Sequence, residues 1–216
     1  MKLPAAPPRA LLFDWDNTLV DNWAVISGAL NATFAAMEQP TWTEAECRAR
    51  VRKSVRDTFP GLFGERWKDA EQLFYKTFEE RHLEGLRPML GALDLLERAR
   101  ERGLYLGIVS NKNGRYLRIE ADHLGWTPRF GRIVGATDAA ADKPAADPVH
   151  AALAGSGIAA GPDVWFVGDA GVDMQCALAA GCIPVLVRDE ETLGEEFDSC
   201  APHLHLRGCS GLTALL

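Results

Sequence analysis

"LLFDWDNTLVD" (residues 11–21) is the most informative stretch of the sequence. An apolar run ends at Asp14, and two further aspartates, Asp16 and Asp21, follow within eight residues. A short apolar run that is bounded by polar residues is typical of a buried strand. Two close carboxylates at the end of such a strand repel each other, and burial raises the free energy needed to keep them charged. The stretch therefore predicts a site where a cation or a proton offsets that cost.

Further apolar runs are typical of strands, because each is short and is bounded by glycine, proline or polar residues. They are LYLGIVS (104–110), DVWFVGD (163–169) and IPVLVRD (183–189), with weaker runs at GRIVGA (131–136) and HLHL (203–206). Helical patterns alternate with them, at 88–102, 147–157 and 171–180. Strands that alternate with helices favour a parallel sheet covered on both faces, so we expect the α/β class.

Residues 20 to about 88 interrupt this alternation. No strand run is visible there, and the sequence from 67 to 86 has the periodicity of an amphipathic helix. The α/β pattern resumes afterwards. We therefore predict an α/β core made of residues 1–19 and 89–216, with a helical domain of residues 20–88 inserted after the first strand.

A basic stretch, CRARVRKSVR (47–56), lies in that insertion. Thr43 and Glu46 form a capping-box pattern just before it, and we expect the helix that follows to carry Arg48, Arg52 and Arg56 on one face. Two interpretations stay open. An arginine or lysine of the stretch reaches the site and selects anionic substrates, or the stretch is a solvated helix face, which we favour.

Composition and charge exclude several classes of protein. A formal net charge of −7 gives no general attraction to nucleic acid or to an anionic membrane. No apolar run reaches the roughly 20 residues of a membrane span, and the proline-broken start MKLPAAPPRA lacks the apolar core of a signal peptide. The five cysteines form no C-x-x-C pair, which predicts free thiols in a reducing compartment. We expect a cytoplasmic protein, and the oligomeric state is not indicated.

Polar side chains lie at the ends of the predicted strands or shortly after them. The residues concerned are Asp14, Asp16, Ser110, Lys143, Asp169 and Asp173. The carboxyl ends of parallel strands share one edge of the sheet, so we expect these side chains to converge in a crevice there. Carboxylate oxygens favour Mg²⁺, and a lysine and a hydroxyl beside such an ion suit a transferring phosphoryl group. An aspartate can also act as a nucleophile and form an aspartyl-phosphate.

Four short motifs carry a family resemblance: DWDNT (14–18), VSNK (109–112), DKP (142–144) and GDAGVD (168–173). The chain resembles the haloacid dehalogenase superfamily, in the phosphoglycolate-phosphatase-like branch that has a helical cap after the first strand. Each motif alone is weak, but all four occur in the family's order and the match covers essentially the whole chain. The resemblance implies a Rossmann-like core with a parallel sheet, plus a small α-helical cap domain.

The resemblance also implies catalytic and metal-binding roles. Asp14 would be the nucleophile, and Asp16 would protonate the leaving oxygen and then activate the water that hydrolyses the aspartyl-phosphate. The first of these tasks requires a raised pKa for Asp16. Mg²⁺ would be held by Asp14, Asp169 and the backbone carbonyl of Asp16, and Asp173 would support the ion directly or through water.

Phosphate contacts are implied for a second set of residues. Ser110 and Lys143 would hold the phosphoryl oxygens, and Lys143 would also neutralise Asp14. Backbone N–H groups near Trp15 and Asn111 would help to bind the phosphate.

Other polar positions have structural interpretations. We expect Thr18 to brace the loop after Asp16 through a backbone hydrogen bond. Asp21 is either a helix N-cap, which we favour, or a residue of the cap hinge. His203 and His205 alternate as in a strand and have no acidic partner nearby in the sequence, so we expect no metal role for them.

The first function hypothesis is a Mg²⁺-dependent phosphatase that acts on a small phosphorylated metabolite, phosphoglycolate-like or a sugar phosphate, through an aspartyl-phosphate. A phosphosugar mutase of the β-phosphoglucomutase type fits the same motifs. A non-catalytic phosphate-binding domain is a third hypothesis, although every catalytic position holds a competent residue. Two classes fit less well: dehalogenating relatives lack the second aspartate, which is Asp16 here, and receiver domains have no cap insertion.

Overall fold

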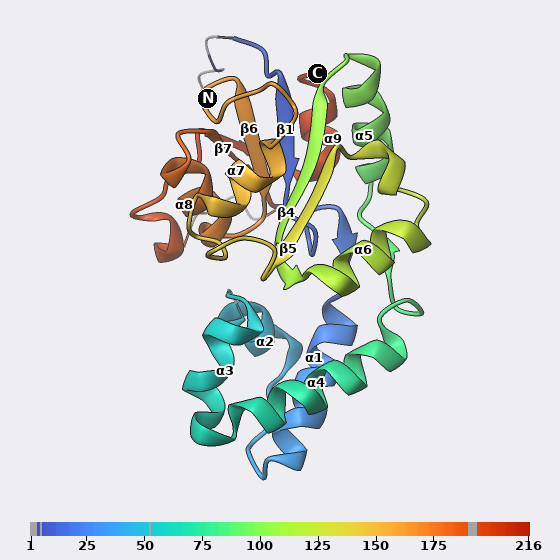
Figure 1. Ribbon diagram of the computed structural model, residues 1–216, viewed down its shortest axis with the longest axis vertical. Coiled ribbons are helices and arrows are strands. Elements are labelled where there is room, and N and C mark those ends of the chain that lie inside the picture. Colours follow the sequence, from blue (N-terminus) through green and yellow to red (C-terminus); the bar gives the residue numbers. More distant parts are fainter. Residues whose placement is uncertain (1–3, 5, 52, 190–193) are drawn as a thin grey trace.

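The computed structural model describes residues 4, 6–51, 53–189 and 194–216. Figure 1 shows two bodies joined by two connecting segments: one is built on a sheet, and the other is made of the helices α1–α4. The arrowheads of β1 and β4 point toward the helical body, so the carboxyl edge of the sheet faces it. This arrangement brings the ends of the central strands next to the inserted helices.

A six-stranded sheet forms the first body, in the order β5-β4-β1-β6-β7-β8, with all neighbours parallel. Its strands are β1 (Ala10–Phe13), β4 (Tyr105–Asn113), β5 (Arg132–Ala136), β6 (Val164–Gly168), β7 (Ile183–Val187) and β8 (Leu204–Leu206). All the runs predicted as strands form this sheet. Phe13 of β1 pairs with Ile108 on one side and Val167 on the other. This central position explains why β1 is apolar throughout.

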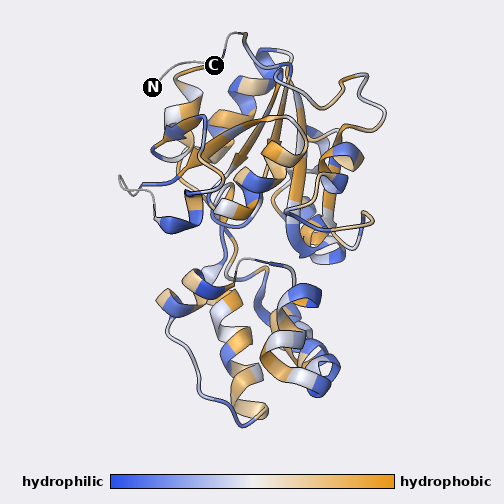
Figure 2. Cartoon of the chain, turned by 90° about the vertical axis from the view of Figure 1, so that its left-hand side faces the viewer, coloured by the Kyte–Doolittle hydropathy of each residue, from blue (hydrophilic) through white to orange (hydrophobic). Residues whose placement is uncertain are grey.

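Helices cover both faces of the sheet. One face packs against α5 (Ala92–Glu101), α6 (Gly114–His123) and α9 (Gly208–Thr213), and the other against α7 (Asp147–Leu153) and α8 (Gly171–Ala179). Alternate side chains of β1 point to opposite faces of the sheet: Leu11 and Phe13 belong to the apolar cluster on one face, and Leu12 belongs to the cluster on the other. Figure 2 shows apolar colour along the strands between the helices. The predicted α/β fold with a parallel sheet is confirmed.

The second body consists of α1 (Trp23–Ala36), α2 (Glu44–Arg50), α3 (Val55–Phe63) and α4 (Trp67–Arg81). It has its own core of buried aromatic side chains: Phe34, Phe59, Phe63, Phe74 and Phe78. This cluster is distinct from those that flank the sheet, and it also includes Tyr116 of α6, whose ring packs against Phe78. Short 3₁₀ helices occur in both bodies: η1 (Gly64–Arg66), η2 (Thr127–Arg129) and η3 (Glu195–Phe197).

The basic stretch is divided between two helices. The capping box is present, because Thr43 Oγ1 accepts the Glu46 N–H over 3.2 Å and the Glu46 carboxylate accepts the Thr43 N–H over 2.8 Å. The helix that it opens ends at Arg50, where the backbone leaves the helical conformation. Arg56 belongs to α3, so the prediction that it shares one helix face with Arg48 is wrong, and Arg52 lies outside the described residues.

The two connections between the bodies run side by side, where β2 (Val20–Asp21) pairs antiparallel with β3 (Arg87–Pro88). Strands of two residues leave no periodic pattern, so neither was predicted. Because Pro88 belongs to β3, the helix predicted from residue 88 begins only at Ala92. It ends before Gly103, which has a left-handed φ of 69°.

Three further expectations concern the whole chain. The five cysteines are free thiols, as predicted, and the structure shows that all five are buried. No helix in the described part of the chain is long and apolar enough to cross a membrane. The domain boundaries, with residues 20–88 as one domain and residues 1–19 and 89–216 as the other, stay a prediction.

Candidate active site

Asp14 and Asp16 leave the centre of the sheet at its carboxyl edge. The Asp14 N–H donates to the Val167 carbonyl over 2.9 Å, so the strand ladder continues to the first aspartate. Asn17 then adopts a φ of 60°, a left-handed conformation that asparagine tolerates, and its N–H donates to the Val20 carbonyl over 2.6 Å. This turn places both aspartates in the wall of a pocket that residues of the two bodies line together.

Lys143 links two buried carboxylates. Its Nζ donates to Asp14 Oδ1 and to Asp173 Oδ1, over 2.7 Å in each case, and its side chain is 2% exposed. Burial lowers the pKa of Lys143, but the two carboxylates outweigh it and raise that pKa overall, so the lysine stays charged. Burial raises the pKa of Asp173 to about 6, with a further contribution from the charge of Asp14, against the opposing effect of Lys143. The lysine predicted from DKP thus meets two of the predicted carboxylates.

Three carboxylates form a group that could hold a metal ion. Asp14, Asp169 and Asp173 each offer an oxygen, and these oxygens lie within 4.8 Å of one another. Gly168 permits the close approach, since a Cβ there would lie 2.4 Å from the Asp173 side chain. Hard carboxylate oxygens suit Mg²⁺ or Ca²⁺, and a cation relieves the repulsion among them. The residues therefore fit a divalent cation, whereas a contribution from the Asp16 backbone carbonyl stays a prediction.

Ser110 and Asn111 reach the same edge on β4. The strand was expected to end at Ser110, but it continues for three residues with a shifted register against β5, an irregularity that re-aims side chains at a sheet edge. Ser110 Oγ accepts the Lys112 N–H over 3.2 Å and lines the pocket. Asn111 holds the backbone of Lys143: its Nδ2 donates to the carbonyl over 3.1 Å, and its Oδ1 accepts the N–H over 3.0 Å. Asn111 thus positions the lysine.

The residues that adjoin Asp14 and Asp16 in the sequence make contacts that differ in part from those predicted. The Trp15 indole is fully buried, so the phosphate contact predicted near Trp15 rests on its backbone and stays a prediction. The brace predicted for Thr18 is wrong: its buried hydroxyl has no hydrogen-bond partner in the described part of the chain. The turn is closed instead by the Leu19 and Val20 N–H groups, which donate to the Trp15 carbonyl. The favoured prediction that Asp21 is a helix N-cap is wrong, because the N-cap of α1 is Asn22. Asp21 lies in β2, in the connection between the two bodies, and its Oδ1 accepts the first N–H of α1 over 3.3 Å.

A buried ion-pair network behind Asp16 was not predicted. Lys112 Nζ donates to Asp16 Oδ1 over 2.8 Å and to Glu120 Oε2 over 2.7 Å. Burial raises the pKa of Asp16 to about 6, helped by Glu120 and Asp14 and opposed by Lys112. Such a value suits a general acid. A sequence signal existed, because Glu120 lies among the apolar residues of α6, three positions after the buried Leu117.

Apolar side chains of the helical body line the other side of the pocket. They are Trp23, Ile26, Val51, Val55, Phe74 and Phe78. Lys53 also lines the pocket, so one residue of the basic stretch does reach the site, whereas Arg48 and Arg50 are exposed as favoured. Arg56 instead donates to Asp142 over 2.6 Å, next to Lys143, and thereby joins the two bodies.

Comparison with known proteins decides the family. The model of the haloacid dehalogenase-like hydrolase family matches residues 11–187. The chain belongs to this family. A phosphoglycolate phosphatase from Xanthomonas campestris is 31% identical over 193 residues, which cover 88% of the chain and 87% of that relative. A phosphoglycolate phosphatase from Escherichia coli is 28% identical, with 96% and 92% covered.

Solved structures of other haloacid dehalogenase-like hydrolases share the fold. A HAD-superfamily hydrolase from Ehrlichia chaffeensis is 29% identical, covers 97% of this chain with 96% of its own, and gives a TM-score of 0.65. A haloacid dehalogenase-like family hydrolase from Streptococcus pneumoniae is 21% identical, with 96% and 98% covered and a TM-score of 0.83, so this second likeness concerns the fold alone. The predicted family and the predicted enzyme class, a phosphoric monoester hydrolase, are confirmed.

Proposed function

We propose that this hydrolase is a Mg²⁺-dependent phosphatase that cleaves a small phosphate monoester through an aspartyl-phosphate on Asp14. The observation that carries the proposal is the position of Lys143, with its Nζ 2.7 Å from Asp14 and from a second carboxylate of the candidate metal group. A cation at this place balances the nucleophile and can also bind a phosphoryl oxygen. Asp16 lies beside the same pocket, where a leaving group would emerge.

In the first step, an Asp14 carboxylate oxygen attacks phosphorus and forms an O–P bond while the ester P–O bond breaks. The leaving oxygen keeps the electron pair and takes a proton from Asp16. Burial raises the pKa of Asp16 to about 6, so that a fraction of the molecules carries this proton near neutral pH. Lys143 and the Ser110 hydroxyl stabilise the phosphoryl oxygens.

In the second step, a water molecule attacks phosphorus and gives its proton to the Asp16 carboxylate. The O–P bond to Asp14 breaks, and inorganic phosphate leaves. Asp14, Asp169 and the Asp16 backbone carbonyl would hold Mg²⁺, with support from Asp173, and the bound ion would supply positive charge to the phosphoryl group.

Residues 20–88 act as a cap in this proposal. Their apolar side chains exclude water from the pocket, and Lys53 offers a cation to an acidic leaving group. The two curated relatives described above are phosphoglycolate phosphatases. The leaving group of phosphoglycolate carries a carboxylate, with which the Lys53 ammonium group could pair. Phosphoglycolate is therefore the first substrate to try, followed by sugar phosphates. The cytoplasmic location stays a prediction.

The test is phosphate release from a panel of monoesters, with Mg²⁺ and with EDTA. We expect release that requires Mg²⁺ and is lost in Asp14→Asn, while Asp122→Asn, an exposed aspartate of α6, retains it. No release from any ester by folded wild type would overturn the proposal. Transfer of the phosphoryl group to a sugar, seen by product analysis, would point to a mutase instead.

A further inference from the structure

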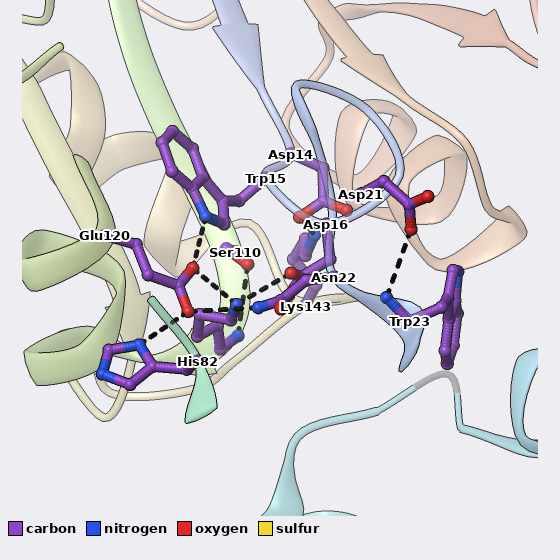
Figure 3. Close-up of polar contacts among 11 residues, drawn as sticks. Asp14, Trp15, Asp16, Asp21, Asn22, Trp23, His82, Ser110, Glu120 and Lys143 are labelled. Atoms are coloured by element: carbon purple, nitrogen blue, oxygen red, sulfur yellow. Dashed lines mark hydrogen bonds and ion pairs between the residues drawn. The ribbon is translucent and has the colours of Figure 1, made fainter. Parts of the chain in front are cut away.

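Glu120 is a fully buried carboxylate whose two oxygens face different parts of the molecule. Oε2 accepts hydrogen bonds from Lys112 Nζ and Trp15 Nε1, each over 2.7 Å. Oε1 lies 3.0 Å from His82 Nδ1 and 3.1 Å from Asn22 Nδ2. A carboxylate has about four acceptor sites, so these donors saturate it. Figure 3 shows Glu120 with dashed lines to Trp15 and to His82.

The two donors on Oε1 mark the two ends of the helical body. Asn22 is the N-cap of α1, and His82 is the residue that directly follows α4. The donors on Oε2 belong to the sheet body, with Trp15 in the loop after β1 and Lys112 on β4. One carboxylate therefore ties both connections of the helical body to the catalytic edge of the sheet.

Lys112 extends this link to Asp16. Its side chain is 6% exposed, and its Nζ bridges Glu120 and Asp16. Burial by itself raises the pKa of Glu120, but Lys112 and the surrounding donors outweigh it and lower that pKa, so Glu120 is ionised at neutral pH. A lysine side chain has many rotamers, and the ionised partner fixes this one in a single place.

We propose that Glu120 is a positioning residue for Asp16. It holds Lys112, which orients the Asp16 carboxyl group toward the leaving oxygen, and its bonds to Asn22 and His82 make that orientation depend on how the helical body is seated. The inference rests on the proposed function, because it concerns the proton that Asp16 delivers. It assigns a role to a carboxylate that lies outside the four motifs.

The role of Glu120 can be separated from simple structural support by the choice of leaving group. Ethyl phosphate releases an alkoxide that needs the proton of Asp16, whereas 4-nitrophenyl phosphate releases a stable anion that does not. For Glu120→Gln we expect kcat/KM to fall roughly 10- to 100-fold with ethyl phosphate, but less than about threefold with the aryl ester. The matched control is Glu79→Gln, an exposed carboxylate of α4 that pairs with Arg115 of α6, and it should leave the ratio of the two values unchanged.

Asn22→Ala is the second variant, because the Asn22 side chain makes no capping hydrogen bond to α1 and its removal spares the helix. We expect the same selective loss with ethyl phosphate, roughly 3- to 10-fold. Equal losses with both esters, or no loss in either folded variant, would overturn this inference alone. A wild type that releases phosphate from neither ester would overturn the proposed function and this inference together.

Discussion

Replacing Lys143 by alanine removes the cation from the centre of the site. In the metal-free protein the change leaves Asp14 and Asp173 facing each other without the Nζ that lies 2.7 Å from both. The Asp173 side chain is fully buried and that of Asp14 is 12% exposed, so water replaces little of the lost interaction. Breaking a buried pair by removal of one partner costs about 3–5 kcal/mol of unfolding free energy. In a chain of this length that corresponds to a fall in Tm of roughly 6–20 °C.

Urea unfolding in EDTA, followed by circular dichroism, measures this loss directly. The matched control is Lys76→Ala, an exposed lysine of α4, which should change the unfolding free energy by less than about 0.5 kcal/mol. Saturating Mg²⁺ should restore part of the loss, since a cation among the same carboxylates does what the lysine did, and binding at 100 times Kd contributes about 2.7 kcal/mol. A loss below about 1 kcal/mol, as for an exposed pair, would contradict this expectation. So would a loss on which Mg²⁺ has no effect.

Three further outcomes are expected. The raised pKa of Asp173, about 6 against an ordinary 3.8, means that the folded protein binds this proton more tightly than the unfolded chain does. The bound proton therefore contributes about 3 kcal/mol to the unfolding free energy below pH 3.8, and this contribution is lost as the pH rises through 6. In EDTA the unfolding free energy of wild type relative to that of Asp173→Asn should decline from pH 4 to 7, and a constant difference would contradict this. In the proposed mechanism Asp16 acts as the acid only while it is protonated. The ratio of kcat/KM for ethyl phosphate to that for 4-nitrophenyl phosphate should therefore fall as the pH rises through about 6 in pH–rate profiles, and a level ratio would argue against Asp16 as the acid. Lys53→Ala should raise KM roughly fivefold for phosphoglycolate and leave it unchanged for ethyl phosphate, which lacks the carboxylate; equal effects on both esters would remove the proposed role of Lys53.

The sheet and the edge that carries the candidate site could be predicted because their signals are local. A buried strand such as β1 is a continuous apolar run, and the polar residue that follows it marks the edge at which parallel strands end. The positions of Asp14, Asp169 and Lys143 follow from that rule together with the order of the motifs. Helix boundaries in the insertion were less predictable. The helix ends at Arg50, but no glycine or proline follows directly to signal that end in the sequence.

The hydrogen-bond network around Glu120 could not be predicted from the sequence for a different reason. Its partners Trp15, Asn22, His82 and Lys112 come from four separate segments, and the contacts exist only once the chain is folded. The two-residue strands of the connections are likewise too short to leave a periodic pattern. Thr18 shows the opposite error, where a plausible local hydrogen bond was expected but the backbone closes the turn by itself.

Capture of the aspartyl-phosphate tests the proposed reaction at its first step. Wild type, Asp14→Asn and Asp16→Asn would be mixed with radiolabelled 4-nitrophenyl phosphate and Mg²⁺, quenched in acid and digested with trypsin. Cleavage after Arg9 and after Arg48 gives peptide 10–48, which contains Asp14, the proposed nucleophile. We expect label on this peptide in wild type, more label in Asp16→Asn because that variant lacks the proposed base of the second step, and none in Asp14→Asn. Rapid turnover by wild type without label on this peptide, or label that persists in Asp14→Asn, would contradict this expectation.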